Sequence, residues 1–296
     1  MTDIGNRAVA PLVAAGLVRA ERIEPFHPRT RDRADLAVLR CAASGVVFLQ
    51  SSDHIDEMFY AEKRQEDAIA RATRSDAVKD ADTARRVATH GGLVAGRRWL
   101  DAGSGEGRML GALGPAAATA MGYDPARWRP SVNAPGAFPV VGDLADVAPG
   151  TIDIVTLYHV LEHVPEPVTC LEQLVTLLDD GGRIVVEVPH GRDALLMRYA
   201  CMPYRDHTLW SEHLVLHTRE SLSAVIEAAG LTVERIDGCQ RYPLANHLHW
   251  LCRGEAGGQE RWPALCDPDL DAAYAARLIA ADETDTLVAV ARKAEQ

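Results

Sequence analysis

A glycine-rich turn, LDAGSGEGRML, carries the first residues with recognisable chemistry. Asp101, Gly103, Gly105 and Gly107 spell D-x-G-x-G-x-G. Glycine permits positive φ in a tight turn and lets a ligand touch the backbone. The spacing differs from the G-x-G-x-x-G of dinucleotide folds, and the G-K-[ST] of a Walker loop is absent. Because a carboxylate at Asp101 would repel a pyrophosphate, the turn favours a ligand with an ammonium or sulfonium group over NAD.

Two further carboxylates follow the next two strand-like segments. Asp124 lies in MGYDPA and Asp143 in VVGDLAD. A carboxylate at Asp124 can accept two hydrogen bonds from a ribose diol, and one at Asp143 can accept a hydrogen bond from an adenine amino group. Open α/β sheets bind ligands at the edge where their parallel strands end. The three acids in this order therefore predict a binding site there, although each alone is more typical of a turn.

The stretch YHVLEHV offers a different chemistry. His159, Glu162 and His163 fit H-x-x-E-H, a spacing found in inverted zinc metalloproteases. Two histidines four residues apart share a metal only on a continuous helix, and Pro165 and Pro167 limit any helix here to about one turn. We therefore predict no metal site, and we interpret Glu162 and His163 as partners in local hydrogen bonds.

Alternating strands and helices must position these residues. Apolar and β-branched runs predict strands in RRWLDAG, AAATAMGYD, FPVVGD, IDIVTL, RIVVEVP, LTVERID and DTLVAVARK. Helices are predicted in EGRMLGALG, which stops at Gly114, in EPVTCLEQLVTLLDDGG with its glycine stop, and in TRESLSAVIEAAG between Thr218 as N-cap and Gly230. This alternation indicates an α/β fold with a mainly parallel sheet covered on both faces.

Four regions are expected along the chain. The N-terminal extension is irregular, with one strand-like piece from Gly45 to Leu49, and turns helical from Glu57 to about Gly91. About 45 residues separate the last two strands, too many for a plain connection, so we expect an insertion that forms a lid or small subdomain. The expected regions are an extension (1–92), a ligand-binding core (93–237), the insertion on the acceptor side (238–283) and the final core strand (284–296).

With these motifs, residues 95 to 237 and the final strand resemble a class I S-adenosylmethionine-dependent methyltransferase. LDAGSGEG resembles the cofactor loop of that family, YDP its ribose acid and GDL its adenine site. DIVTLYHVLEHVPEP resembles the fourth strand of a subgroup that acts on sugars and other small molecules. The resemblance implies a Rossmann-like sheet of seven strands, mostly parallel with the last antiparallel. It implies S-adenosylmethionine as cofactor, with Tyr158 and His159 near the sulfonium. The implied cofactor-binding residues are Asp101, Gly103, Gly105, Gly107, Asp124, Pro125, Asp143, Leu144, Tyr158 and His159.

The acceptor side is less sharply defined. SEHLVLHTRESLSAVIEAAGLTV resembles a later segment of the subgroup, in which some sugar C-methyltransferases use a Glu-His pair at the acceptor. We expect the catalytic base to be His213 with Glu212, then His190, then His159. Acceptor contacts are expected from two segments, and an alternative for the second is a lid or dimer surface. The residues are Tyr204, Arg205, His207, Arg241, Tyr242, Asn246 and His247.

Many of these sugar enzymes carry an N-terminal zinc knuckle that ends C-x-x-C-G. This chain has CAASG, with Cys41 but Ser44, and no cysteine pair upstream. None of its six cysteines forms a C-x-x-C pair, so we expect no structural zinc and a reducing, cytoplasmic compartment. No signal peptide and no membrane span are predicted.

The charge balance limits the partners. Lys and Arg total 31 against 42 Asp and Glu, a net charge of −11 that argues against nucleic acid and anionic membranes. The expected function is methylation of a small-molecule acceptor, a sugar or nucleotide-linked sugar hydroxyl or carbon, in surface-polysaccharide or secondary-metabolite biosynthesis. Alternatives are a non-catalytic S-adenosylmethionine-binding partner protein, an NAD-dependent oxidoreductase and methylation of RNA or protein. A homodimer is compatible with the sequence.

Overall fold

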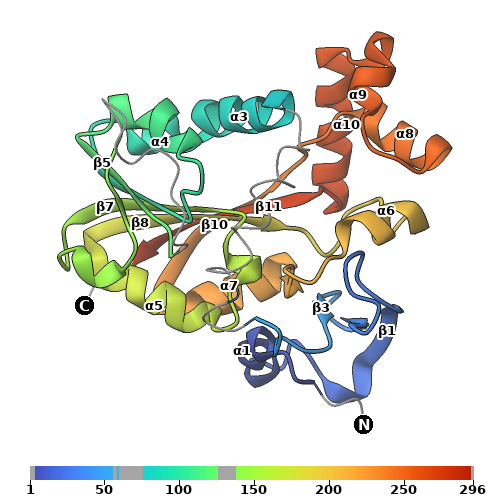
Figure 1. Ribbon diagram of the computed structural model, residues 1–296, viewed down its shortest axis with the longest axis horizontal. Coiled ribbons are helices and arrows are strands. Elements are labelled where there is room, and N and C mark those ends of the chain that lie inside the picture. The colour runs from blue at the N-terminus through green and yellow to red at the C-terminus, as the bar shows by residue number, and fades with distance from the viewer. Residues whose placement is uncertain (1–3, 56–58, 60–75, 126–137, 295–296) are drawn as a thin grey trace.

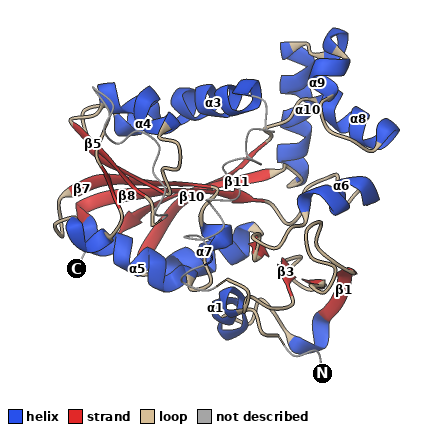
Figure 2. Ribbon diagram, viewed as in Figure 1, coloured by secondary structure: helices blue, strands red, loops and turns tan. Residues whose placement is uncertain are grey.

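The computed structural model describes residues 4–55, 59, 76–125 and 138–294. Within them, a large sheet lies between two layers of helices, a small sheet lies near the N-terminus, and a group of helices formed by residues 244–281 projects on the side of the molecule away from the C-terminus (Figure 1; Figure 2). None of the described helices has the length and apolar character to cross a membrane.

The large sheet has seven strands. They are β4 (Arg98–Ala102), β5 (Thr119–Tyr123), β6 (Val140–Val141), β7 (Ile152–Tyr158), β8 (Leu178–Pro189), β10 (Leu231–Cys239) and β11 (Thr286–Lys293). Their spatial order is β10-β11-β8-β7-β4-β5-β6. Strand β11 is antiparallel to both neighbours, and the pairs from β8 to β6 are parallel. The predicted Rossmann-like sheet, mostly parallel with its last strand antiparallel, is confirmed.

Helices cover both faces of this sheet. Helices α3 (Asp76–Val94) and α4 (Arg108–Leu113) lie on one face, with α5 (Pro167–Leu177) and α7 (Arg219–Ala228) on the other (Figure 1). The central strands are buried on both sides, which explains their continuous apolar sequences. Six consecutive residues of β11, from Thr286 to Ala291, are buried.

Most helix ends follow the sequence signals. Thr218 caps α7 in a capping box with Ser221, and Gly230 follows with φ +78°. Helix α4 ends at Gly114, as predicted. The predicted glycine stop of α5 is wrong, because the helix ends at Leu177 and the next residues belong to β8. Leu178 is buried and pairs with Ile152 of β7, so sheet pairing decides the end of this helix.

The N-terminal region is more ordered than its sequence suggests. It contains η1 (Arg7–Val9), α1 (Ala10–Ala14), η2 (Ala20–Arg22), β1 (Ile23–His27), β2 (Val38–Cys41) and β3 (Val47–Leu49). These strands form a second sheet in the order β1-β2-β3-β9, where β9 (Val215–Leu216) comes from the core half of the chain. The strand-like piece 45–49 is β3, whereas β1 and β2 were missed. Of the helix predicted over 57–91, α3 lies in the described part, and residues 57, 58 and 60–75 lie outside it.

Between β10 and β11 the chain forms α8 (Leu244–Arg253), α9 (Gly258–Arg261), η7 (Pro263–Leu265) and α10 (Pro268–Ala281). Short elements elsewhere are η4 (Gly114–Ala116), α6 (Met202–Thr208) and two single turns, η5 (Leu144–Asp146) and η6 (Leu161–His163). The group α8 to α10 lies near the N-terminal end of α3, beyond the edge at which the parallel strands end (Figure 1). This placement brings the long connection beside the predicted ligand edge.

Candidate active site

The glycine turn after β4 has the backbone that its sequence predicts. Gly103, Gly105 and Gly107 have φ values of +76°, +51° and +74°, which side chains disfavour. The N–H of Gly103 donates to the carbonyl of Tyr123 at 2.7 Å, which fixes the turn against β5. A Cβ at Gly103 would lie 2.4 Å from Cγ2 of Val160, so the turn also packs directly against the end of β7.

Asp101 is buried beneath this turn. Its side chain is 3% exposed, and Oδ1 accepts a hydrogen bond from the Thr156 hydroxyl at 2.8 Å, which in turn accepts one from Trp99. Burial raises the pKa of Asp101 to about 7, although the Thr156 hydrogen bond opposes this rise. A cation beside the carboxyl group would favour its charged form. The position therefore suits a ligand with a positive group.

The other two strand-end acids lie along the same edge. Asp124 is buried at the end of β5, where Oδ2 accepts a hydrogen bond from the N–H of Gly105 at 2.9 Å. Asp143 is exposed after β6, where Oδ1 caps η5 through the N–H of Ala145 at 3.0 Å. Leu144 packs against the core from η5. Strands β4, β5 and β6 are consecutive in the sheet, so the structure brings these acids to one edge.

The fit of this edge to a nucleoside with a cationic group can be judged from its polar atoms. The carboxylates offer acceptors for hydroxyl and amino groups, and the turn leaves its backbone open to close approach. The hydroxyl of Ser104 is buried and has no hydrogen-bond partner among the described residues. Sequence reasoning missed Ser104, although its position between Gly103 and Gly105 was a usable signal. These features fit the predicted cofactor.

Tyr158, the last residue of β7, and His159, which follows it, contact α3 and β8. The Tyr158 hydroxyl lies 3.0 Å from Nδ1 of His90, and the Arg86 guanidinium lies 4.6 Å from the centre of the Tyr158 ring. His159 has φ +55°, uncommon for a residue with a side chain. Its backbone N–H donates to the carbonyl of Glu187 in β8. The end of β7 is therefore tied to both neighbouring elements.

Glu162 forms a local hydrogen bond with His159, as predicted, whereas His163 contacts a segment 49 residues later in the chain. Nδ1 of His159 lies 2.9 Å from Oε1 of Glu162, which is buried, and Nδ1 of His163 lies 2.9 Å from the carbonyl of Glu212. Burial would raise the pKa of Glu162, but the His159 hydrogen bond and the nearby histidines lower it to about 2. The ring of His213 lies 5.1 Å from that of His163.

These residues also form the group that could hold a metal ion. Ligand atoms of Glu162, His163 and His213 lie within 4.8 Å of one another. The first two sit in the single turn η6, and His213 comes from a distant segment. The continuous helix of an inverted zinc metalloprotease is therefore not formed. The absence of a metal stays a prediction.

A buried ionic network lies between α3 and the strand ends. Arg85 and Arg86 donate to the carboxylate of Glu187, whose side chain is fully buried. Arg241 pairs with Asp82 of α3, and its Nη1 lies 3.0 Å from Nε2 of His159. Apart from Arg241 and His159, sequence reasoning missed this network, because α3 reads as an ordinary charged helix.

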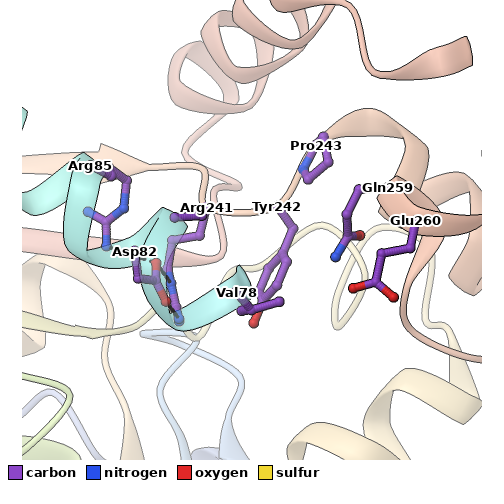
Figure 3. A pocket seen from close by; sticks show the side chains of 9 residues that line it. Val78, Asp82, Arg85, Arg241, Tyr242, Pro243, Gln259 and Glu260 are labelled. Atoms are coloured by element: carbon purple, nitrogen blue, oxygen red, sulfur yellow. Dashed lines mark hydrogen bonds and ion pairs between the residues drawn. The ribbon is translucent and has the colours of Figure 1, made fainter. Parts of the chain in front are cut away.

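A cavity of about 210 Å³ opens where α3 meets the insertion (Figure 3). Arg241 and Tyr242 were expected near the acceptor, and both line it. The complete lining is Val78, Ala81, Asp82, Arg85, Arg241, Tyr242, Pro243, Gln259 and Glu260. Because Arg241 also contacts His159, the cavity lies directly beside the end of β7.

The other expected acceptor residues are not among those that line this cavity. The Tyr204 hydroxyl donates to Asp193 at 2.7 Å, Arg205 donates to the carbonyl of Leu196, and His207 packs 5.1 Å from the Trp250 ring. Asn246 and His247 are buried within the insertion, where they contact Gly257, Tyr274 and Gln240.

Of the expected bases, His190 is buried and His213 is partly buried. Nδ1 of His190 lies 3.0 Å from the carbonyl of Thr284, and burial lowers the pKa of His190 to about 4. Burial also lowers the pKa of His213 well below its usual value. Their catalytic roles, and that of Glu212, stay predictions.

Comparison with known proteins identifies the family. A family model described as a methyltransferase domain matches residues 60–236, more than half of the chain. Two curated ubiquinone biosynthesis O-methyltransferases, from Aeromonas salmonicida and Ralstonia nicotianae, are 32% and 30% identical over 35% and 33% of this chain. The chain spans less than half of their length, 45% in each case.

Solved structures share the fold. A SAM-dependent methyltransferase from Thermotoga maritima covers 81% of this chain and all of its own, with a TM-score of 0.53 and 15% identity. The Burkholderia thailandensis 1,6-didemethyltoxoflavin-N1-methyltransferase, solved with S-adenosylhomocysteine, covers 88% and 97%, with a TM-score of 0.50 and 16% identity. The chain therefore belongs to the class I methyltransferase family, whose cofactor is S-adenosylmethionine.

Proposed function

We propose that the protein methylates a hydroxyl group of a small polar acceptor, of the sugar or nucleotide-linked sugar type. The observation that carries this proposal is the position of the cavity. It adjoins the end of β7 through the contact between Arg241 and His159, and the cofactor turn packs against the next residue, Val160. The curated relatives are named O-methyltransferases, which supports oxygen as the methylated atom.

The chemistry asks the protein mainly for alignment. Bound S-adenosylmethionine supplies a methyl group on a positively charged sulfur. Asp101 would face its cationic part, Asp124 its ribose and Asp143 its adenine, as the resemblance implies. Correct orientation of two reactants is worth up to about 7–11 kcal/mol, and a base that takes the hydroxyl proton adds a factor of about 10²–10⁴.

The lining of the cavity combines a mainly apolar exposed surface with several polar side chains, a combination that suits a ring-shaped acceptor such as a sugar. Five of its nine residues carry charged or amide side chains, and Tyr242 offers one aromatic face. The net charge of −11 does not favour RNA as acceptor. In this proposal the insertion contributes the acceptor side, and a small molecule is the partner.

The first test is calorimetric titration with S-adenosylmethionine and S-adenosylhomocysteine, with NAD and Zn²⁺ as controls. We expect micromolar binding of the first two, lost in Asp124→Ala and kept in Asp146→Ala, a nearby exposed acid. A screen of nucleotide sugars and phenols then follows formation of S-adenosylhomocysteine. Binding of NAD alone, or cofactor binding with turnover of no hydroxyl acceptor, would contradict the proposal.

A further inference from the structure

We propose that Arg241 is a positioning residue that holds the ring of His159 uncharged, with its single proton on Nδ1. Arg241 lines the cavity, whereas His159 lies at the end of β7 beside Val160, which packs against the cofactor turn. The contact between the two side chains therefore links the cavity to the cofactor edge. One consequence, which rests on the proposed function, is that His159 is not the base that takes the hydroxyl proton.

The contact between Arg241 and His159 determines which atom carries the hydrogen. Nη1 of Arg241 lies 3.0 Å from Nε2 of His159. A guanidinium group stays charged in proteins and has only hydrogen-bond donors. Nε2 must therefore accept this hydrogen bond and cannot carry a proton. An imidazole ring without a proton on Nε2 has its proton on Nδ1.

The other ring nitrogen faces a carboxylate and requires the same tautomer. Nδ1 of His159 lies 2.9 Å from Oε1 of Glu162, whose side chain is fully buried. Burial opposes ionisation of Glu162, but the hydrogen bond from His159 outweighs it and lowers the pKa of Glu162 to about 2. A charged carboxylate only accepts, so Nδ1 must donate. Turning the ring over would remove both contacts, so they also determine its orientation.

A second carboxylate lies near Nε2, but it does not need the proton. Oε1 of Glu187 is 3.3 Å from Nε2 of His159. This oxygen already accepts hydrogen bonds from Nη2 of Arg85 at 2.9 Å and from Nε and Nη2 of Arg86 at 3.1 and 2.6 Å. A proton on Nε2 would also bring two N–H groups together at the closer contact, with Arg241. The hydrogen bond from Arg241 is therefore favoured.

Arg241 can impose this state because its own side chain is fixed. Its Nε donates to Oδ1 of Asp82 at 3.0 Å and its Nη2 donates to Oδ2, which leaves Nη1 to face His159. Asp82 lies beside Arg241 at the cavity (Figure 3). The backbone N–H of Arg241 donates to Asp285 at 3.0 Å. The side chains of Arg241 and Asp82 are only 10% and 15% exposed, so water competes little for these contacts.

Both nitrogens of His159 are thus occupied. Because Nε2 accepts from Arg241 and Nδ1 donates to Glu162, neither nitrogen can take a proton from an acceptor hydroxyl while these contacts hold. An uncharged ring also adds no positive charge near the cofactor turn, where the sulfonium of S-adenosylmethionine brings its own. His159 then connects the cavity to the cofactor edge, and the base is another residue.

Nitrogen NMR of the histidine rings tests this assignment. Long-range ¹H–¹⁵N spectra distinguish protonated from unprotonated ring nitrogens, and they are recorded on full-length protein with ¹⁵N-labelled histidine, saturated with S-adenosylhomocysteine near pH 7.5. The signals that disappear in His159→Gln belong to His159. We expect its Nδ1 to be protonated and its Nε2 to be unprotonated. A protonated Nε2, in the other neutral tautomer or in a charged ring, would overturn the inference.

Three variants test the role of Arg241. Arg241→Met combined with Asp82→Leu removes the donor without leaving an unpaired buried charge. We expect the Nε2 signal of His159 to shift to the protonated position, because the ring then faces carboxylates without a competing donor. Arg241→Lys keeps a donor and should retain the unprotonated Nε2. Arg277→Met removes an exposed arginine from the same insertion and should leave the His159 signals unchanged.

An unprotonated Nε2 in the folded double variant would show that Arg241 does not position the ring. Calorimetry on each variant should give an affinity for S-adenosylhomocysteine within about twofold of the unmodified protein. The spectra need no acceptor, so a failed acceptor screen would contradict the proposed function and leave the tautomer assignment standing. A protonated Nε2 in the unmodified protein, with intact binding of S-adenosylhomocysteine, would instead leave methyl transfer standing and return His159 to the candidate bases.

Discussion

The strand edge that carries Asp101, Asp124 and Asp143, the proposed cofactor edge, and the cavity beside Arg241 are assembled in different ways. The edge takes its residues from the ends of successive parallel strands, β4, β5 and β6, which are neighbours in both sequence and space. The cavity takes its residues from three separate segments, 78–85, 241–243 and 259–260. A local pattern in the sequence can therefore specify the edge, whereas the cavity exists only once the insertion has docked beside α3.

The two regions also treat charge differently. Asp101 at the edge is buried, and burial raises its pKa to about 7. At the cavity Asp82 is held by Arg241, and this guanidinium lowers the pKa of Asp82 even though burial alone would raise it. The edge is thus suited to a ligand that brings positive charge, whereas at the cavity the charges of Asp82 and Arg241 compensate each other within the protein.

Breaking the ion pair at the cavity should have the largest effect on stability. In Arg241→Met the Asp82 carboxylate stays largely buried and loses its main partner, so the free energy of unfolding should fall by about 3–5 kcal/mol. Adding Asp82→Leu should recover most of this loss, because no unpaired charge then remains. Urea unfolding of the two single variants and the double variant measures the coupling.

If the cavity does not influence cofactor binding at the strand edge, the affinity of folded Arg241→Met protein for S-adenosylhomocysteine should lie within about twofold of that of the unmodified protein. Calorimetry well below the melting temperature tests this point. A tenfold loss of affinity would show that the cavity wall also supports the cofactor edge, through the contact of Arg241 with His159.

Gly103→Ala makes the complementary change at the cofactor edge. The new Cβ needs φ near +76° and would meet Val160 at 2.4 Å. Strain of about 1–2 kcal/mol for the backbone and about 1–3 kcal/mol for overpacking gives an expected loss of roughly 2–5 kcal/mol. Because the turn must shift, binding of S-adenosylhomocysteine should fall at least a hundredfold.

Gly111→Ala is the matched control for this substitution. Gly111 lies in α4, has no positive φ, and a Cβ there would meet nothing within 4 Å. Unchanged cofactor affinity and a small gain in stability are expected, since alanine favours a helix. Equal losses of cofactor affinity in both glycine variants would show that the glycine turn has no special role in cofactor binding.

The fold and the shape of the glycine turn could be predicted from sequence because their determinants are local. The strand runs, the positive-φ glycines and the Thr218 cap each act within a few residues. The end of α5 could not be predicted, because pairing of Leu178 with Ile152 overrides the glycine signal. Strands β1 and β2 were missed because their sheet is completed by β9, which begins about 170 to 190 residues later in the chain.

The acceptor side shows the same limit. Arg241 and Tyr242 were expected near the acceptor, yet Asp82, Arg85 and Gln259 lie in segments with no recognisable motif. Their shared location depends on docking of the insertion against α3. The histidines were expected to act as bases because of their side-chain chemistry alone, and His190 is fully buried.

The smallest expected effect concerns Asp101. Replacing its carboxyl group should raise the stability of the protein and lower its affinity for the cofactor, so the two effects have opposite signs. The native pKa of about 7 lies above the ordinary value of 3.8, so the native state binds the proton more tightly than the unfolded state does. The unmodified protein therefore loses stability as pH rises from about 4 to 7 and stays at the lower value above that. Asp101→Asn removes this loss, since its side-chain oxygen can still accept the Thr156 hydrogen bond.

Urea unfolding at several pH values should show no gain for Asp101→Asn near pH 4 and a gain on the order of 1–3 kcal/mol at pH 8. Affinity for S-adenosylmethionine should fall at least tenfold at pH 8, because the cofactor's positive group loses its partner.

Asp153→Asn is the control of opposite sign, since Arg98 lowers the pKa of Asp153 and the variant should lose a little stability above pH 4. A gain for Asp101→Asn that is equal at all pH values would assign it to packing. The predicted combination, a more stable protein that binds its cofactor less well, would mean that the edge keeps a destabilising carboxyl group for its ligand, whereas the cavity neutralises its charges within the protein.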